Sequence, residues 1–172
     1  QLGSGESSQP FKTAKDYRDW LSRVRLFSVW ADTAIADFKK GIAAGIVLPK
    51  ALVVKMIPQM QAMTVNDTAT NVFYGPLKKY PASFSAAQKD SITNEYRQTI
   101  TTYLIPTYKK LGDFLKNEYL PKARTTTGIG AVPEGKERYN YLIRYWTTTD
   151  KSAEEIYNTG LSEVQRIRGL ME

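Results

Sequence analysis

Apolar side chains recur every three or four positions along most of this chain, the spacing that is typical of amphipathic helices. The longest stripe is predicted to be buried and comprises Tyr17, Leu21, Val24, Phe27, Ala31, Ala34, Ile35, Phe38 and Ile42. Thr13 and Asp16 have the spacing of a capping box at its start, and Gly41 and Gly45 stand where a helix stop is expected. The pattern therefore predicts one long helix of roughly eight turns, beginning at Thr13.

The same spacing predicts four further helices, at about 49–63, 86–120, 136–147 and 153–172. Capping-box pairs precede two of them, Ser85 with Gln88 and Ser152 with Glu155. In the last helix the apolar stripe that is predicted to face inward comprises Ile156, Leu161, Val164 and Ile167. The β-branched pair Val53-Val54 leaves a strand open for the second segment, although the i, i+3, i+4, i+7 spacing favours a helix.

Prolines and glycines interrupt these helices at defined places. Pro58 and Pro106 fall inside helical patterns and predict kinks, because each removes a backbone hydrogen bond. Short helical turns are expected near 68–73 and 76–80. A loop is expected over residues 121–135, PKARTTTGIGAVPEG.

The chain is therefore predicted to be all-α, with long kinked helices packed as an irregular bundle. Residues 1–12 are predicted to be a flexible leader. Residues 13–172 are predicted to form a single helical domain, which includes the loop 121–135. No apolar run reaches the roughly 20 residues that a membrane-spanning helix requires.

Composition excludes several kinds of active site. The 172 residues include no Cys and no His. Disulfides, thiolate nucleophiles, His general bases and His- or Cys-bound zinc are therefore impossible within the chain. A site made of carboxylates or lysines stays open. The pair Glu154-Glu155 is better explained by the favourable dipole at a helix start.

The net charge of +7 is compatible with an acidic partner. The 24 Lys and Arg residues are spread along the chain, however, as expected for a solvated surface. A nucleic-acid partner is not predicted, because nucleic-acid-binding segments usually cluster their charge.

Two segments contain residue types that are found in binding sites. Gly128 and Gly130 superficially match a dinucleotide-binding loop, but the third glycine is missing and no strand precedes them. Tyr139, Tyr141, Tyr145 and Trp146 form an aromatic cluster that is suited to stacking on bases or sugars. On a helix, Tyr139 and Trp146 share the stripe that is predicted to be buried, so core packing is favoured for them. Tyr141 and Tyr145 face elsewhere and are candidates to line a cleft.

Several stretches resemble a known bacterial family, domain of unknown function 885. They are GSGESSQPFKTAKDY (3–17), KGIAAGIVLPK (40–50), ARTTTGIGAVP (123–133), TTTD (147–150) and EIYNTGLSEV (155–164). The resemblance spans nearly the whole chain. It departs from the usual family pattern at Tyr157, where many members have His.

This resemblance implies a largely helical relative of the gluzincin zinc metallopeptidases, often exported and sometimes a lipoprotein. The implied zinc motif, His-Glu-x-x-His with a downstream Glu, would lie C-terminal to this chain, so the resemblance transfers no metal ligand and no catalytic residue to it. It implies that the chain is a fragment whose partner is the rest of its parent protein, with a peptide as a candidate substrate and the periplasm or a lipid anchor as the expected location. The candidate cleft-lining residues are Arg124, Gly128, Gly130, Tyr139, Tyr141 and Tyr145.

Two functions are expected on these grounds. The first is a helical scaffold that is not catalytic alone and forms one wall of the cleft of a zinc metallopeptidase-like protein. The alternative is a non-catalytic helical binding module for an acidic partner, which the positive charge and the lack of His favour.

Overall fold

The computed structural model describes residues 9–65 and 67–172, and the described residues contain six α-helices and no strand. The predicted all-α class is therefore confirmed. The chain divides into two compact units, residues 1–125 and 126–172. The boundary lies inside the predicted loop 121–135.

The first unit begins with α1 (Ala14–Ala43) and α2 (Lys50–Ala62). Short 3₁₀ turns follow at Thr68–Thr70 and Val72–Lys78, and then come α3 (Ala86–Thr99) and α4 (Ile105–Phe114). The predicted capping boxes at Thr13 and Ser85 are both present. Gly45 follows the end of α1 with a φ of 70°, a left-handed conformation that glycine adopts without steric strain.

Most of the predicted leader 1–12 lies outside the described residues. Phe11, at its end, packs against the core, with its ring 5.0 Å from that of Tyr17 and 6.3 Å from that of Trp20.

The predicted third helix runs from α3 to α4 through a wide π turn, Ile100–Leu104, and a second π turn, Leu115–Tyr119, follows α4. Each π turn ends two residues before a proline, Pro106 or Pro121. A proline ring would clash with the carbonyl four residues earlier, and the wider turn moves that carbonyl aside. Pro58, in contrast, lies within α2, which continues through it as one α-helix.

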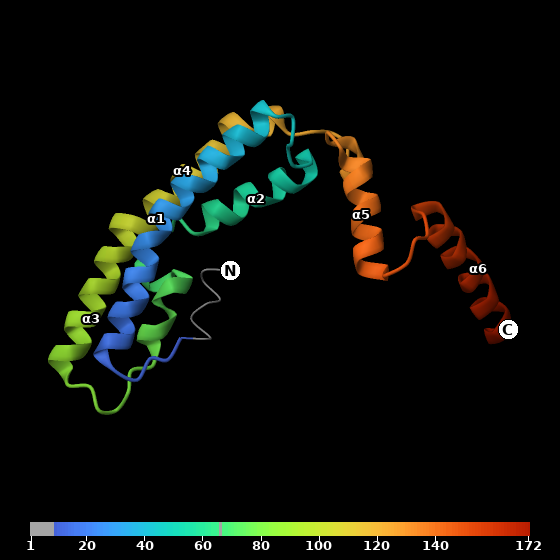
Figure 1. Cartoon of the computed structure of the whole chain (residues 1–172). Helices are drawn as coiled ribbons and strands as arrows, with labels where there is room; N and C mark the ends of the chain where they lie inside the picture. The colour runs from blue at the N-terminus through green and yellow to red at the C-terminus, as the bar shows by residue number, and fades with distance from the viewer. Residues whose placement is uncertain (1–8, 66) are drawn as a thin grey trace. The chain divides into compact units, whose positions relative to one another are not determined.

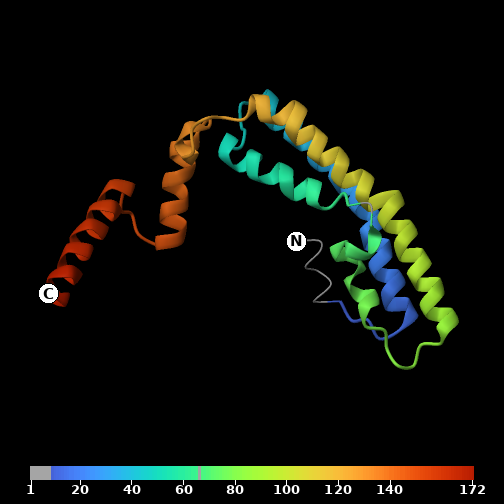
Figure 2. The same cartoon turned by 180° about the vertical axis from the view of Figure 1, so that it is seen from behind.

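Helix α1 and the composite helix α3–α4 lie side by side and run in the same direction (Figures 1 and 2). Three interhelical ion pairs document the register: Arg18–Glu95 at 3.0 Å, Lys110–Asp32 at 2.6 Å and Lys39–Glu118 at 2.9 Å. The partners are 77 to 79 residues apart in each pair. This nearly constant separation is the signature of two parallel helices, and α2 packs on α4 beside them.

Two apolar clusters form the core of this unit. The larger one lies where the first half of α1 meets α3 and the segment around Phe73, and it includes Tyr17, Trp20 and Tyr96. The smaller one joins α2 to the end of α4 and the following π turn through Val53, Phe114, Leu115 and Tyr119. Met60 of α2 packs against both clusters.

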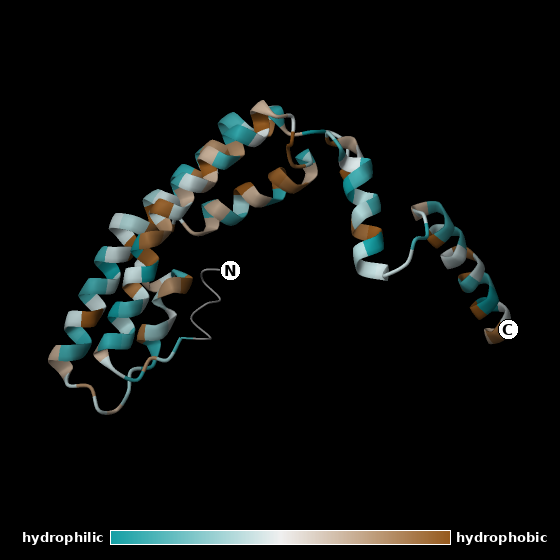
Figure 3. Cartoon of the chain, viewed as in Figure 1, coloured by the Kyte–Doolittle hydropathy of each residue, from teal (hydrophilic) through white to brown (hydrophobic). Residues whose placement is uncertain are grey.

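The second unit contains a 3₁₀ turn at Ile129–Ala131, α5 (Gly135–Thr147) and α6 (Ala153–Met171). The capping box that Ser152 and Glu155 were predicted to form is present. The burial predicted for Tyr139 and Trp146 of α5 and for most of the α6 stripe is wrong, whereas Ile156 is partly buried. Tyr139 and Trp146 are 47% and 76% exposed, and Leu161, Val164 and Ile167 of α6 are each about half exposed. Apolar residues do recur along α6, as Figure 3 shows. The prediction of burial failed because periodicity identifies an apolar face but does not show that another element packs against it.

Candidate functional site

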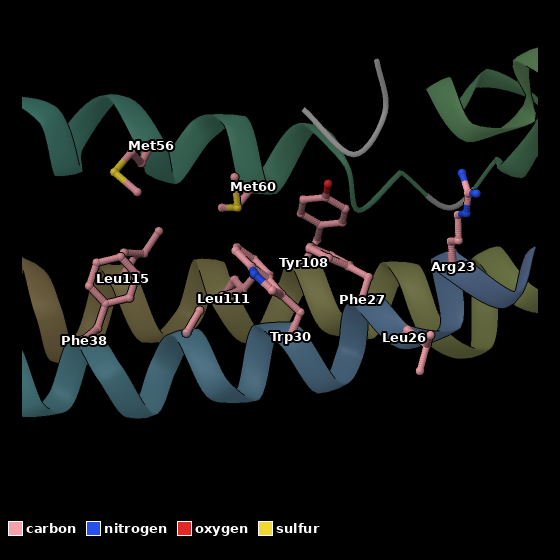
Figure 4. Close-up of a pocket in the computed structure, with 11 residues that line it drawn as sticks. Arg23, Leu26, Phe27, Trp30, Phe38, Met56, Met60, Tyr108, Leu111 and Leu115 are labelled. Atoms are coloured by element: carbon pink, nitrogen blue, oxygen red, sulfur yellow. The ribbon is translucent and has the colours of Figure 1, made fainter. Parts of the chain in front are cut away.

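An apolar groove lies between α1 and α2 in the first unit, with α4 as its floor (Figure 4). We call it the α1–α2 groove. Its volume is about 610 Å³, within the range of small-molecule sites. It is lined by Arg23, Leu26, Phe27, Trp30, Ala34, Phe38, Met56, Met60, Tyr108, Leu111 and Leu115.

The groove exists because α1 and α2 each pack on α4 while leaving a gap between themselves. Figure 4 shows Met56 and Met60 of α2 opposite Phe38 and Trp30 of α1. Trp30 is 61% exposed although its ring stacks on Phe27 at 5.5 Å. An exposed Trp at the edge of an apolar hollow is the kind of surface that binding sites use.

Few polar groups reach this groove. Tyr108 packs its ring 4.9 Å from Phe27, and burial raises the pKa of its hydroxyl above the ordinary value of 10. The hydroxyl is therefore neutral near pH 7 and offers hydrogen bonds only. The charged group at the groove is Arg23, which lies at one end of the row of lining residues in Figure 4.

The lining set suits binding rather than chemistry. It contains no carboxylate, lysine or hydroxyl–base pair that would act as a nucleophile or general base. Zinc does not fit the chain either, because no His or Cys is available and no group of three Asp or Glu residues among those described is placed to hold a metal. We therefore assign no catalytic step to these residues.

A family model described as a bacterial protein of unknown function, DUF885, matches residues 1–172. The chain belongs to this family. The structure is similar to part of the crystal structure of a "putative lipoprotein" from Colwellia psychrerythraea, with a TM-score of 0.85 and 26% sequence identity. That match covers 95% of the present chain but only 28% of the other one. The DUF885 chain thus spans just over a quarter of the length of this neighbour. A search among curated proteins gave no match.

The six cleft candidates of this DUF885 chain fall outside the α1–α2 groove. Arg124 belongs to the first unit, where its Nε donates to the Val47 carbonyl at 3.0 Å. Its backbone N–H donates to Leu48 and its carbonyl accepts from Lys50, at 3.1 and 2.7 Å. Arg124 thus fastens the segment after α4 to the loop before α2.

The other five candidates lie in the second unit. Gly128 precedes the 3₁₀ turn that contains Gly130, and α5 carries the three tyrosines. Tyr141 and Tyr145 are both exposed, and their rings stack at 6.2 Å. Their role as cleft-lining residues stays a prediction.

Sequence reasoning missed the α1–α2 groove. The predicted stripe of α1 included Phe27, Ala34 and Phe38, all of which line the groove, but they were assigned to the core. The overlooked signal is a surplus of apolar residues beside that stripe, at Leu26 and Trp30. An apolar arc wider than one packing partner can cover indicates a second contact surface.

Proposed function

We propose that this chain is a helical scaffold within a longer, zinc metallopeptidase-like protein, and that it holds no zinc ligand itself. The main observation in favour of this proposal is the apolar face of α6. Leu161, Val164 and Ile167 form an apolar stripe that remains about half exposed. A helix of 19 residues with such a stripe normally buries it against another element.

The comparisons support a longer protein as the source of that element. The structural neighbour from Colwellia psychrerythraea has most of its length outside the region that this chain matches. In the proposed arrangement, further helices pack on the apolar face of α6 and carry the zinc site that the resemblance implies. The description of the neighbour as a lipoprotein supports a periplasmic or membrane-anchored location. None of the described helices is both long and apolar enough to cross a bilayer.

The test uses the natural protein that contains these residues. Zinc content is measured by elemental analysis, and hydrolysis is measured on a mixed fluorogenic peptide library. We expect about one zinc per chain and zinc-dependent cleavage. Val164→Glu on the apolar face of α6 should reduce the yield of soluble, zinc-loaded protein, because it places a charge where packing is proposed.

Gln165→Glu is the matched control, since it adds the same charge at the neighbouring exposed position of α6. A protein without stoichiometric zinc, or one without peptidase activity, would refute the metallopeptidase assignment. Equal effects of the two substitutions would refute the scaffold role of α6.

A second candidate function is a binding module for an acidic partner, which the net charge of +7 favours. Titration of the 172-residue chain with poly-glutamate at 50 and 200 mM salt tests it. Binding that weakens steeply with salt would support this function, and absence of binding at both concentrations would exclude it.

A further inference from the structure

The walls of the α1–α2 groove restrict what can occupy it. They are three helices, α1, α2 and α4, whose interior backbone groups are paired within each helix except at Pro58 of α2, which has no N–H to offer the carbonyl of Val54. An extended peptide would find too few backbone partners there and would leave most of its own amides unpaired, which is costly in an apolar site. The occupant must therefore have no unpaired N–H or C=O groups of its own.

The size of the groove favours a thin occupant. Along α1, lining residues extend from Arg23 to Phe38, a distance of about 22 Å at the usual helical rise. A helix of that length and about 10 Å in diameter occupies roughly 1,700 Å³, so the 610 Å³ groove could enclose only part of it. A single acyl chain, which spans about 15 Å in half of a bilayer core, fits the length.

The chemistry of the lining agrees with a hydrocarbon chain. Phe38, Leu111 and Leu115 offer only carbon to the groove, and Met56 and Met60 add flexible thioethers on the opposite wall (Figure 4). Methionine side chains adapt to irregular apolar shapes. Such a surface selects for apolar area and length rather than for particular polar groups.

Arg23 supplies the one charged contact among the lining residues. Its Nη1 donates to the side-chain oxygen of Gln9 at 2.8 Å, and Gln9 is neutral. Arg18, five residues earlier on α1, is instead paired with the carboxylate of Glu95. Arg23 can therefore accept an anionic head group at the cost of one neutral hydrogen bond, and its guanidinium binds a carboxylate with two parallel N–H donors.

We infer that the α1–α2 groove binds a long-chain fatty carboxylate, with the acyl chain between α1 and α2 and the carboxylate on Arg23. This inference does not depend on the proposed metallopeptidase function, because it uses only groups of the first unit.

The experiment is calorimetric titration with palmitate below its micelle concentration, and with hexadecanol as the uncharged analogue. We expect saturable one-to-one binding of palmitate. Arg23→Gln should weaken palmitate binding about tenfold or more, because a hydrogen bond to a charged group usually contributes that much to affinity. It should leave hexadecanol binding unchanged. Arg97→Gln is the control with the same net charge, because Arg97 is exposed on α3 and does not line the groove.

A steric pair of variants tests the location of the acyl chain. Ala34→Phe places a ring in the groove and should abolish binding of both ligands, whereas Ala36→Phe, at an exposed position of the same helix, should not. Thermal unfolding of each variant checks that the fold is intact. Equal binding by the two variants, or equal loss of palmitate and hexadecanol binding in Arg23→Gln, would overturn the proposal.

Two further outcomes would also overturn it. One is binding by the 172-residue chain but not by the longer natural protein, which would make the groove an internal interface. The other is failure of palmitate combined with saturable binding of a synthetic peptide of residues 153–172, which would show that the groove selects an amphipathic helix.

Discussion

The hydroxyl of Tyr119 provides a sharp test of how the first unit is held together. It accepts a hydrogen bond from the backbone N–H of Leu48 at 2.9 Å, across 71 residues of sequence. Tyr119 is only 1% exposed, and its ring contacts Phe38 and Phe114 at centroid distances of 5.0 and 6.0 Å. Tyr119→Phe removes the hydroxyl and keeps these ring contacts, so it isolates one hydrogen bond.

The expected loss follows from the group that is left behind. An unsatisfied buried donor costs about 1–3 kcal/mol. Leu48 is half-buried, so water partly replaces the lost acceptor, and about 1–2 kcal/mol is expected. This corresponds to a fall in Tm of about 4–8 °C for a unit of this size.

Urea unfolding followed by circular dichroism measures the free energy of unfolding, and hydrogen exchange at the Leu48 amide reports the bond directly. Tyr103→Phe is the control, because Tyr103 is 40% exposed and its loss of a hydroxyl should change stability by less than about 0.5 kcal/mol. If the two variants are equally stable and Leu48 exchange is unchanged, the hydrogen bond does not hold the loop before α2.

Three further outcomes are expected. Ser85→Ala removes the capping box with Gln88 and should lower the unfolding free energy by about 1 kcal/mol, measured in urea, whereas an unchanged value would contradict the cap. Hydrogen bonds from Arg18 hold the pKa of the Glu95 carboxyl below its ordinary value of 4.5. Because the folded-state pKa is the lower one, the pair stabilises above pH of about 4.5 and this contribution is lost as the pH falls through the folded-state value. Unfolding free energies measured against pH should thus fall less steeply on the acid side in Glu95→Gln than in the wild type, and identical slopes would disprove the linkage. Thr148, at the end of α5, has a φ of 54°, so Thr148→Gly should slow hydrogen exchange in the last turn of α5 through a gain of about 1 kcal/mol, and faster exchange would contradict the strain.

The sequence predicted local features well, because they are encoded by neighbouring residues. The capping boxes at Thr13, Ser85 and Ser152 all form, and each helix begins at the residue after its cap. What surrounds a helix is decided by distant segments. Val164 therefore sits on a correctly predicted apolar stripe of α6 and is nevertheless about half exposed.

The α1–α2 groove could not be predicted for a related reason. Its existence depends on α1 and α2 both packing on α4 without closing on each other. No local pattern specifies that spacing. The sequence shows only that Leu26 and Trp30 widen the apolar arc of α1. The ion pairs that mark the helix register, such as Lys110–Asp32, connect residues 78 positions apart.

The π turn before Pro106 explains how the buried side chains of α3 and of α4, the floor of that groove, stay on one face of the composite helix. Buried side chains recur at every fourth position through the composite helix, at Ile92, Tyr96, Ile100, Leu104 and Tyr108. In a regular α-helix each step of four residues turns the side chain by about 40° beyond one full turn, so four steps would rotate Tyr108 by about 160° away from Ile92. The wide turn at Ile100–Leu104 absorbs part of this rotation, because a π turn takes up more residues. One face of the composite helix therefore stays in contact with the parallel helix α1 along its length. As a result, Tyr108 of α4 lies at the groove rather than in solvent. A strict four-residue repeat that ends near a proline is thus a sequence signal for a π turn.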